Sequence, residues 1–143
     1  MKLEDKIAFV SAAGRGIGKA IAKGLAAEGS TVVVNSYSEE TAAGTADDIK
    51  KSGGKAVSMP GDATDPETIL ALASRTIDEF GRIDVLVNNV GAAPKEAPEI
   101  PNNALGKTES LWNAMYRQNL LPTVLMTEAV SKEMKRQQDG KIV

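Results

Sequence analysis

Residues 10–18 read Val-Ser-Ala-Ala-Gly-Arg-Gly-Ile-Gly, and this stretch decides the fold. It follows an apolar run from Ile7 to Val10 and opens a segment with helical periodicity. The order is therefore a strand, a glycine-rich turn and the start of a helix. Such a turn presents free backbone N–H groups at a helix N-terminus, where they bind phosphate. The stretch predicts an α/β fold that binds a nucleotide.

Composition excludes several classes of protein. The chain has 143 residues, a net charge of −2 at pH 7, and neither cysteine nor histidine. These absences rule out a disulfide framework, a thiol nucleophile, a Ser-His-Asp triad and an ordinary zinc site. The basic residues form no stripe for nucleic acid, and no apolar run reaches the ~18 residues of a membrane span. We expect a cytoplasmic protein with no metal, nucleic-acid or membrane partner.

Apolar runs alternate with amphipathic segments, which predicts βαβ units and a parallel sheet. The runs are rich in Val, Ile or Leu, as in strands buried on both faces. They cover residues 7–11, 31–35, 56–59 and 83–88, and residues 140–143 begin another. We expect a Rossmann-type doubly wound sheet in the order 3-2-1-4-5, incomplete at its C-terminal side. Residues 1–143 would then form a single dinucleotide-binding domain, truncated in the fifth strand.

The first helix is expected to pack one face on the sheet. Helical spacing places Ile17, Ile21 and Leu25 on that face, beside the small residues Ala20 and Gly24.

Three further helices are predicted from spacing and capping residues. The first covers residues 41–52, and the second begins after the N-cap Asp65 and stops at Gly81. The third is a long helix over residues 108–137, which Pro122 distorts because proline lacks an N–H group.

The glycine pattern of the turn separates two kinds of dinucleotide site. The motif G-x-G-x-x-G fails because Lys19 stands where its third glycine would be. The pattern T-G-x-x-x-G-x-G fits, with Ser11 in the threonine place, Ala12 in the first glycine place, and Gly16 and Gly18 in the others.

Further landmarks follow in a consistent order: Asp62-Ala63, Asn88-Asn89-Val90-Gly91, Asn119 and Gly140-Lys141-Ile142-Val143. Together with the turn, they make the chain similar to the short-chain dehydrogenase/reductase family over essentially its whole length. The resemblance implies an oxidoreductase that transfers hydride between a nicotinamide cofactor and a carbonyl or alcohol substrate. It also implies a homo-dimer or tetramer in which the long helix contributes to the subunit contact.

The resemblance places cofactor contacts in the turn and in the loops after the strands. These residues are Ser11, Ala12, Gly14, Arg15, Gly16, Ile17, Gly18, Asn35, Ser36, Tyr37, Asp62, Ala63, Asn89, Val90 and Gly91. Residues 35–38 are neutral, whereas an acidic residue there would bind the ribose 2′-OH of NAD. Arg15 can pair with a 2′-phosphate, which favours NADP over NAD. Alternatively, Arg15 is a solvated surface residue, and Glu39 and Glu40 argue against a second phosphate.

Two positions of the predicted site carry open questions. Ala12 departs from the family pattern, because glycine there permits a tight turn with positive φ and alanine opposes it. Asp62 either accepts a hydrogen bond from the adenine amino group or serves as a turn residue. Asn88 is expected to tie strand ends together rather than to contact a ligand.

Asn119 is the one position that matches the family's catalytic Asn, Ser, Tyr and Lys. Its backbone carbonyl would hold a water linked to the lysine, and the alternative is an asparagine that faces solvent. The chemistry needs a tyrosine with a lysine four residues later, but Tyr37 and Tyr116 are followed there by Thr41 and Leu120.

Two functions remain open. We prefer the cofactor-binding portion of an NADP-dependent oxidoreductase whose catalytic Ser, Tyr and Lys lie outside this chain. The alternative is a catalytically inactive, truncated nucleotide-binding or interaction module. Residues 94–107 form a long loop that we expect to shape the mouth of the substrate site.

Overall fold

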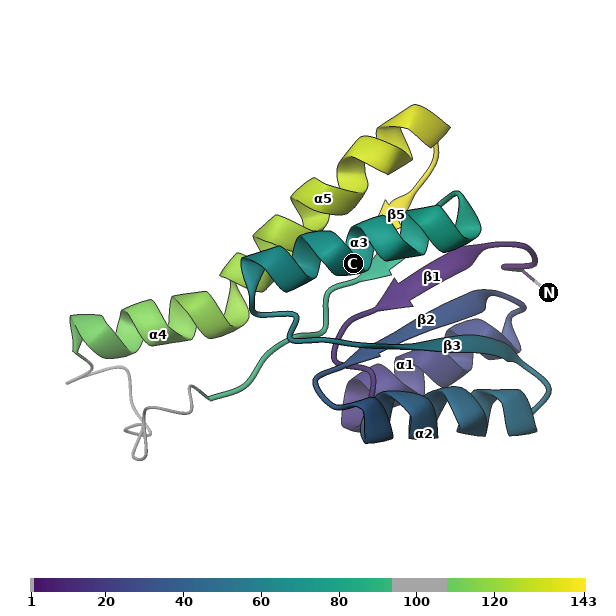
Figure 1. Cartoon of the computed structure of the whole chain (residues 1–143), viewed down its shortest axis with the longest axis horizontal. Coiled ribbons are helices and arrows are strands. Elements are labelled where there is room, and N and C mark those ends of the chain that lie inside the picture. The colour runs from purple at the N-terminus through teal and green to yellow at the C-terminus, as the bar shows by residue number, and fades with distance from the viewer. Residues whose placement is uncertain (1, 94–107) are drawn as a thin grey trace.

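The computed structural model describes residues 2–93 and 108–143 and contains a five-stranded parallel sheet with helices on both faces (Figure 1). The strands are β1 (Ile7–Val10), β2 (Thr31–Ser36), β3 (Lys55–Pro60), β4 (Val85–Val87) and β5 (Lys141–Ile142). The helices are α1 (Gly16–Ala27), α2 (Glu39–Lys51), α3 (Pro66–Phe80), α4 (Glu109–Asn119) and α5 (Leu121–Gln137). The strand order β3-β2-β1-β4-β5 confirms the predicted fold class.

Strand β1 lies at the centre of the sheet. Ile7 to Val10 pair in register with Thr31 to Val34 of β2, and β4 lies on the other side of β1. Every residue of β1 is apolar and buried. Helix layers on both faces of the sheet explain this composition, because neither face of the strand meets water.

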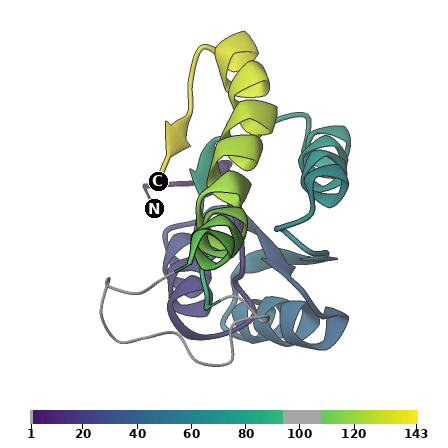
Figure 2. The same ribbon diagram turned by 90° about the vertical axis from the view of Figure 1, so that its left-hand side faces the viewer.

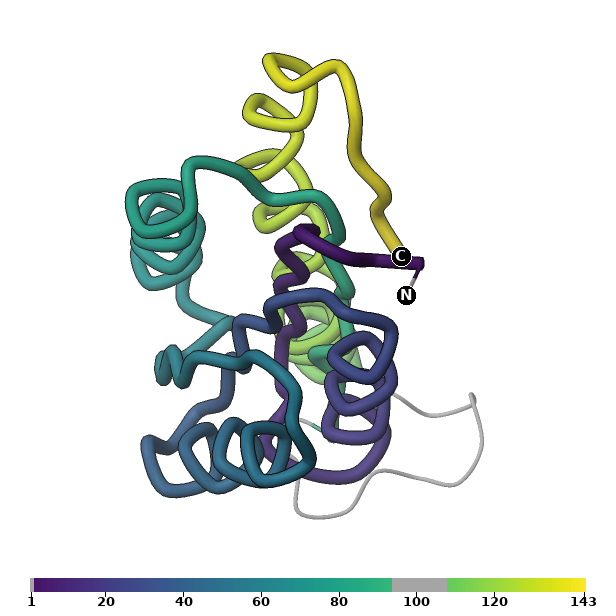
Figure 3. The backbone as a smooth tube through the Cα atoms, turned by 90° about the vertical axis from the view of Figure 1, so that its right-hand side faces the viewer, coloured from purple at the N-terminus to yellow at the C-terminus, as the bar shows by residue number. Residues whose placement is uncertain are grey.

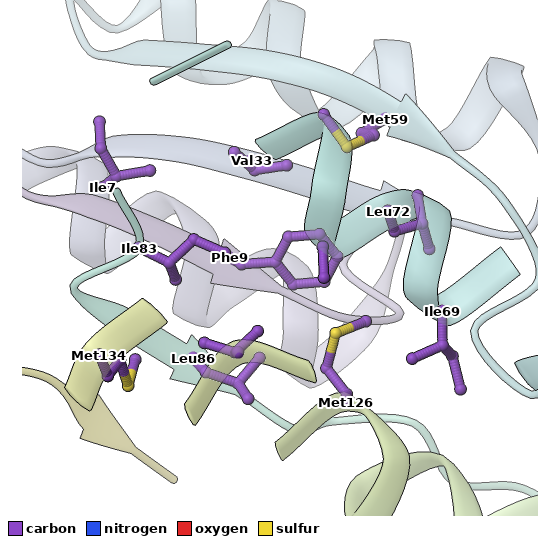
Figure 4. Packing of buried hydrophobic residues seen from close by; sticks show 12 residues of the cluster. Ile7, Phe9, Val33, Met59, Ile69, Leu72, Ile83, Leu86, Met126 and Met134 are labelled. Carbon is purple, nitrogen blue, oxygen red and sulfur yellow. The ribbon is translucent and has the colours of Figure 1, made fainter. Parts of the chain in front are cut away.

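The helices form two layers, with α1 and α2 on one face of the sheet and α3 and α5 on the other (Figure 3). On the α3 and α5 face, Phe9 is completely buried near Leu86 and Met126 (Figure 4). On the opposite face, small residues such as Ala22 of α1 and Ala46 of α2 make the contact. The two layers together enclose the strands.

Helix α1 approaches the sheet through a face different from the predicted one. Its buried residues are Gly18, Ala22 and Ala26. Ile17 is 75% exposed, Ala20 and Gly24 also face solvent, and Ile21 and Leu25 are only partly buried. The prediction was wrong about the centre of the face because small side chains let a helix axis lie closer to the strands, while larger ones pack at its sides.

Capping residues set three helix ends. The carboxylate of Asp65 accepts a hydrogen bond from Thr68 N at 2.8 Å, and Gly81 ends α3 with φ 73°, both as predicted. Helix α2 begins at Glu39 rather than at residue 41, because the Ser38 hydroxyl caps it by accepting a hydrogen bond from Thr41 N.

The predicted single helix over residues 108–137 is two helices, which meet at an angle at Leu120 (Figure 1). The hydrogen bond from Leu120 N to Tyr116 O closes α4, and the bond from Val124 N to Leu120 O opens α5. Pro122 explains the break, because it has no N–H for the carbonyl of Gln118. The carbonyls of residues 117–119 therefore lie between the two hydrogen-bond ladders.

Strand β4 is shorter than the predicted run of residues 83–88. The Gln137 side chain accepts a hydrogen bond from Ile83 N and donates one to Ile83 O, each at 3.0 Å. Ile83 therefore bonds to α5 through its backbone, and the ladder begins at Val85.

Candidate functional site

The candidate site lies where the carboxyl ends of the strands meet at one edge of the sheet. The strand order reverses direction at β1, with β2 and β3 on one side and β4 and β5 on the other. Ligands of open α/β sheets bind at such a switch point. Four segments begin at this edge, because each follows the carboxyl end of a strand: the turn at residues 11–16 after β1, and the loops after β2, β3 and β4.

The turn after β1 leaves the start of α1 without a side-chain cap. Arg15 is the N-cap residue, makes no capping hydrogen bond and precedes a first turn without acidic residues. By contrast, α2, α3 and α4 are capped by Ser38, Asp65 and Thr108. The first N–H groups of α1 are thus available to an anion.

Close packing explains two of the three glycines in residues 14–18. A Cβ atom at Gly18 would lie 2.5 Å from both Ala12 O and Asn89 Nδ2, and one at Gly14 would overlap the Ser36 hydroxyl. Gly16 has φ 55°, a conformation that glycine adopts without strain. The turn is therefore held tightly against the loops that follow β2 and β4.

Ala12, in the first glycine place, has φ 49°. This left-handed conformation is disfavoured for alanine by its Cβ atom. The predicted conflict between alanine and a positive φ is therefore present, and Ala12 adopts the strained conformation.

Two asparagines contact the backbone of the turn. Asn35 is 1% exposed, and its Oδ1 accepts a hydrogen bond from Ala12 N at 3.4 Å. Asn89 Nδ2 donates to Ser11 O at 3.3 Å and to Ala12 O at 3.2 Å, and Asn89 N donates to Ser11 Oγ at 2.8 Å. Asn89 therefore ties the ends of β1 and β4 together.

Asn88 links the end of β4 to two other elements, one through its side chain and one through its backbone. Its Nδ2 donates to Thr127 Oγ1 at 3.3 Å, and its backbone N–H donates to Val143 O at 2.8 Å. Asn88 thus connects the end of β4 to α5 and to the residue after β5.

Hydroxyl groups gather after β2, beside the glycine turn. Thr41 Oγ1 lies 2.8 Å from Ser36 Oγ and 2.8 Å from Ser38 Oγ. Arg15, in the turn, and Tyr37, after β2, are exposed. Glu39, the next acidic residue along the chain, accepts a hydrogen bond from the Ser58 hydroxyl of β3 at 3.3 Å.

Asp62 presents one carboxylate oxygen to its own loop. Its Oδ1 accepts hydrogen bonds from Thr64 N at 2.9 Å and from Thr64 Oγ1 at 2.6 Å. This is the geometry of a turn residue. Within the described parts of the chain, Oδ2 accepts no hydrogen bond and is left for another donor.

Asn119 clamps the segment that follows Gly91. Its Oδ1 accepts a hydrogen bond from Ala92 N at 2.9 Å, and its Nδ2 donates to Ala92 O at 3.1 Å and to Met115 O at 2.9 Å. A Cβ atom at Gly91 would lie 3.3 Å from Asn119 Oδ1. The side chain is therefore not directed at solvent, and the helix break leaves its backbone carbonyl outside both ladders.

A shallow pocket joins several of these elements. It is lined by Ser11, Ala63, Asn88, Val90, Pro122, Thr123 and Met126. The sequence did not suggest Thr123 as a site residue. Nor did it suggest Thr45, whose buried hydroxyl donates to Gly14 O at 3.2 Å, because hydroxyl residues inside helices carry no distinct signal.

The most buried of the charged groups with a displaced pKa lies away from this edge. Asp84, which precedes β4, is buried near Lys6 and Arg82 at the amino ends of the strands. Burial raises the pKa of Asp84, but hydrogen bonds from Arg82, Ile7 N and Lys6 together hold the pKa below its usual value. Residues 2–93 and 108–143 contain no cluster of three or more potential metal-ligating side chains and no helix able to cross a membrane.

Comparison with known proteins identifies this arrangement. The family model for short chain dehydrogenase matches residues 6–143. The chain belongs to the short-chain dehydrogenase family. This match confirms the resemblance seen in the turn and its later landmarks.

Curated relatives include proteins named 3-oxoacyl-[acyl-carrier-protein] reductase. A 3-oxoacyl-[acyl-carrier-protein] reductase from Synechocystis is 39% identical, over 99% of this chain and 55% of its own length. The corresponding enzyme from Escherichia coli is 34% identical, over 100% of this chain and 55% of its own length. The chain thus spans about half the length of the curated relatives it matches.

Solved short-chain dehydrogenase structures share the fold closely. A 7α-hydroxysteroid dehydrogenase complexed with NADH and 7-oxo glycochenodeoxycholic acid has a TM-score of 0.87 and 30% identity, covering 99% of this chain and 52% of its own. A metagenomic short-chain oxidoreductase in complex with NADP has a TM-score of 0.86 and 31% identity, covering 99% of this chain and 62% of its own. Both nicotinamide cofactors therefore occur among the neighbours.

Proposed function

We propose that this chain is the cofactor-binding portion of an NADP-dependent oxidoreductase that transfers hydride between the nicotinamide and a carbonyl or alcohol substrate. The observation that carries the proposal is the uncapped start of α1, behind a turn held against the loops after β2 and β4. The family's Ser, Tyr and Lys would lie outside residues 1–143. Those residues would form one dinucleotide-binding domain.

The cofactor's phosphates would lie against the N–H groups of the turn, including those of Gly16 and Ile17. These two residues are exposed, and nothing lies within 4 Å of a Cβ atom built at Gly16. The exposed side chain of Ile17 would pack on the cofactor. Bound there, the cofactor would supply the hydride chemistry.

The loops after β3 and β4 would hold the rest of the cofactor. Asp62 Oδ2, with Ala63 beside it, would accept a hydrogen bond from the adenine amino group. Asn89, Val90 and Gly91 would run alongside the ribose. The Asn119 carbonyl would hold a water for the catalytic lysine, which its position in the helix break supports.

NADP is favoured over NAD by the surroundings of β2. Arg15 is exposed and follows Gly14, which packs against the Ser36 hydroxyl. Arg15, Ser36 and Ser38 together would receive a 2′-phosphate. The hydrogen bond from Ser58 draws the carboxylate of Glu39 toward β3, which reduces its repulsion of that phosphate.

The second candidate is a nucleotide-binding module without catalysis of its own. One observation speaks for it: neither tyrosine in the chain has a lysine four residues later. Both candidates bind the same cofactor and differ in whether further polypeptide completes the catalytic group.

Association with a second copy is part of the proposal. Helix α4 has no buried residue and extends away from the sheet (Figure 1), and Figure 2 shows it from its outer end. Tyr116, Leu120 and Val124 are each about half exposed and four residues apart, so they share one face across α4 and α5. A dimer or tetramer contact there would cover them. A cytoplasmic location stays a prediction.

Titration of the purified chain with NADPH and NADH, followed by cofactor fluorescence, tests the proposal. We expect saturable binding of both cofactors, with NADPH bound more tightly. Absence of binding to either would overturn both candidate functions. Tighter binding of NADH than of NADPH would overturn only the assignment of NADP as the cofactor.

A further inference from the structure

Asn35 connects two loops of the candidate site from a buried position. Its Nδ2 donates hydrogen bonds to Met59 O and to Gly61 O, each at 3.1 Å. These two bonds use both N–H groups of the amide and fix its plane. Its Oδ1 then faces Ala12 N, 3.4 Å away. One side chain therefore links the end of β3 to the glycine turn.

The turn is strained at the residue that Asn35 contacts. Ala12 has φ 49°, where an alanine is disfavoured unless its surroundings hold it. Asn35 holds its N–H group, and Asn89 holds its carbonyl. The next N–H group, that of Ala13, donates to Asn35 O at 2.7 Å. Asn35 thus binds two successive N–H groups of the turn.

We propose that Asn35 is a positioning residue for the dinucleotide, and that it acts by holding Ala12 in its left-handed conformation. This inference rests on the proposed function. Asn35 is 1% exposed, and its amide is occupied by Ala12, Met59 and Gly61, so its side chain does not contact the cofactor itself. It sets the position of the turn relative to the loop that begins with Gly61 and Asp62.

The proposal makes the effect of Asn35 depend on the residue at position 12. Without the amide, Ala12 relaxes from its strained conformation and the turn shifts. Glycine adopts the left-handed conformation without help, so it keeps the turn in place when Asn35 is absent. The two positions are therefore energetically coupled.

A double-mutant cycle on the full chain, read by NADPH fluorescence titration, tests this coupling. We expect Asn35→Ala to raise the Kd for NADPH roughly tenfold and Ala12→Gly to change it less than about threefold. The double variant should return to within about threefold of the starting Kd. If Asn35→Ala does not fold, Asn35→Ser replaces it, because the shorter side chain cannot bridge β3 and the turn.

Ser30→Ala is the matched control for loss of a buried hydrogen bond. Ser30 is 1% exposed and donates to Leu25 O at 2.9 Å, before the amino end of β2 and so away from the turn. We expect it to lower the melting temperature without changing the Kd. The inference would be overturned if Asn35→Ala raised the Kd for NADPH by the same factor with alanine and with glycine at position 12. It would also be overturned if Asn35→Ala left the Kd unchanged. Failure of the unaltered chain to bind NADPH would instead overturn the proposed function on which it rests.

Discussion

Single residues in the turn after β1 decide how closely other elements approach it. Gly18 has no room for a Cβ atom, whereas Gly24, six residues later in α1, has open space around it. Ala12 takes a conformation suited to glycine, and Arg15 is exposed. The packing space, the backbone conformation and the charge of the turn region can therefore each be changed by a single substitution.

Arg15→Ala should raise the Kd for NADPH roughly tenfold or more, because a charge-assisted hydrogen bond contributes about 1.5–3 kcal/mol. The Kd for NADH should change less than about twofold, since NADH has no 2′-phosphate. Fluorescence titration with both cofactors measures the difference. Arg75→Ala, which removes the same charge from an exposed position in α3, is the control. An equal rise in the Kd for both cofactors would contradict a contact between Arg15 and the 2′-phosphate.

Alanine at two glycines of α1 should have opposite effects on stability. Gly18→Ala should lower the free energy of unfolding by about 2 kcal/mol, because its Cβ atom overlaps Ala12 O and Asn89 Nδ2. Gly24→Ala should raise it by about 0.5–1 kcal/mol, because alanine is the better helix former. Urea denaturation of both variants measures the changes. A rise in the free energy of unfolding for both variants would show that the turn tolerates the additional methyl group.

At the scale of elements, side chains rather than backbone ladders join several pieces of the fold. Gln137 joins α5 to Ile83, Asn119 joins α4 to Ala92, and Asp84 joins the starts of β1 and β4. Asp84 is the one charged side chain of these three, and it is only 2% exposed. It accepts hydrogen bonds from Ile7 N at 2.9 Å and from Lys6 and Arg82. These links come from residues far apart in the sequence.

Asp84→Asn should lower the free energy of unfolding by about 2 kcal/mol at pH 7, because the hydrogen bonds from Lys6 and Arg82 lose their charged acceptor. The folded-state pKa of Asp84 lies below its unfolded value, so its contribution is complete above about pH 4 and is lost as the pH falls through the folded pKa. The difference between the variant and the parent should therefore shrink below about pH 4.

Urea denaturation at several pH values between 7 and 3 measures this change. Asp47→Asn, at a carboxylate 60% exposed on α2, should alter stability by less than about 0.5 kcal/mol. A difference for Asp84→Asn that stays constant over the whole pH range would show that its charge makes no contribution.

At the scale of the whole molecule, the sheet is enclosed by two helix layers, while α4 extends beyond them (Figure 1). The described residues thus combine a closed core around β1 with a helix that has no buried side chain. A second copy packed on α4 would supply the missing partner. The exposed apolar residues shared by α4 and α5 support that arrangement.

Val124→Glu should shift the protein from an oligomer to a monomer, because a carboxylate in an apolar contact loses its hydration. Sedimentation velocity on the variant and the unaltered chain measures the change. Leu70→Glu is the control, since Leu70 is 60% exposed and belongs to α3 rather than to α4 or α5. An unaltered chain that already sediments as a monomer would contradict the proposed contact.

The sequence by itself determined the fold class, the strand order, the family and the position of the turn. Local patterns carry this information, because apolar runs, glycine spacing and caps such as Asp65 act within a few residues. Helix boundaries followed from the sequence except where Ser38 capped α2 early and Pro122 divided the long helix in two.

Only the tertiary structure decided which side chains meet. It placed Asn35 in contact with Ala12 and Met59, so that the amide of a residue expected to touch the cofactor forms hydrogen bonds with the protein. It also exposed Ile17, and it paired Asn119 with Ala92. Such contacts depend on how closely helices and loops approach one another across the sheet. Sequence spacing does not contain that distance, because it results from packing between residues that are remote in the chain.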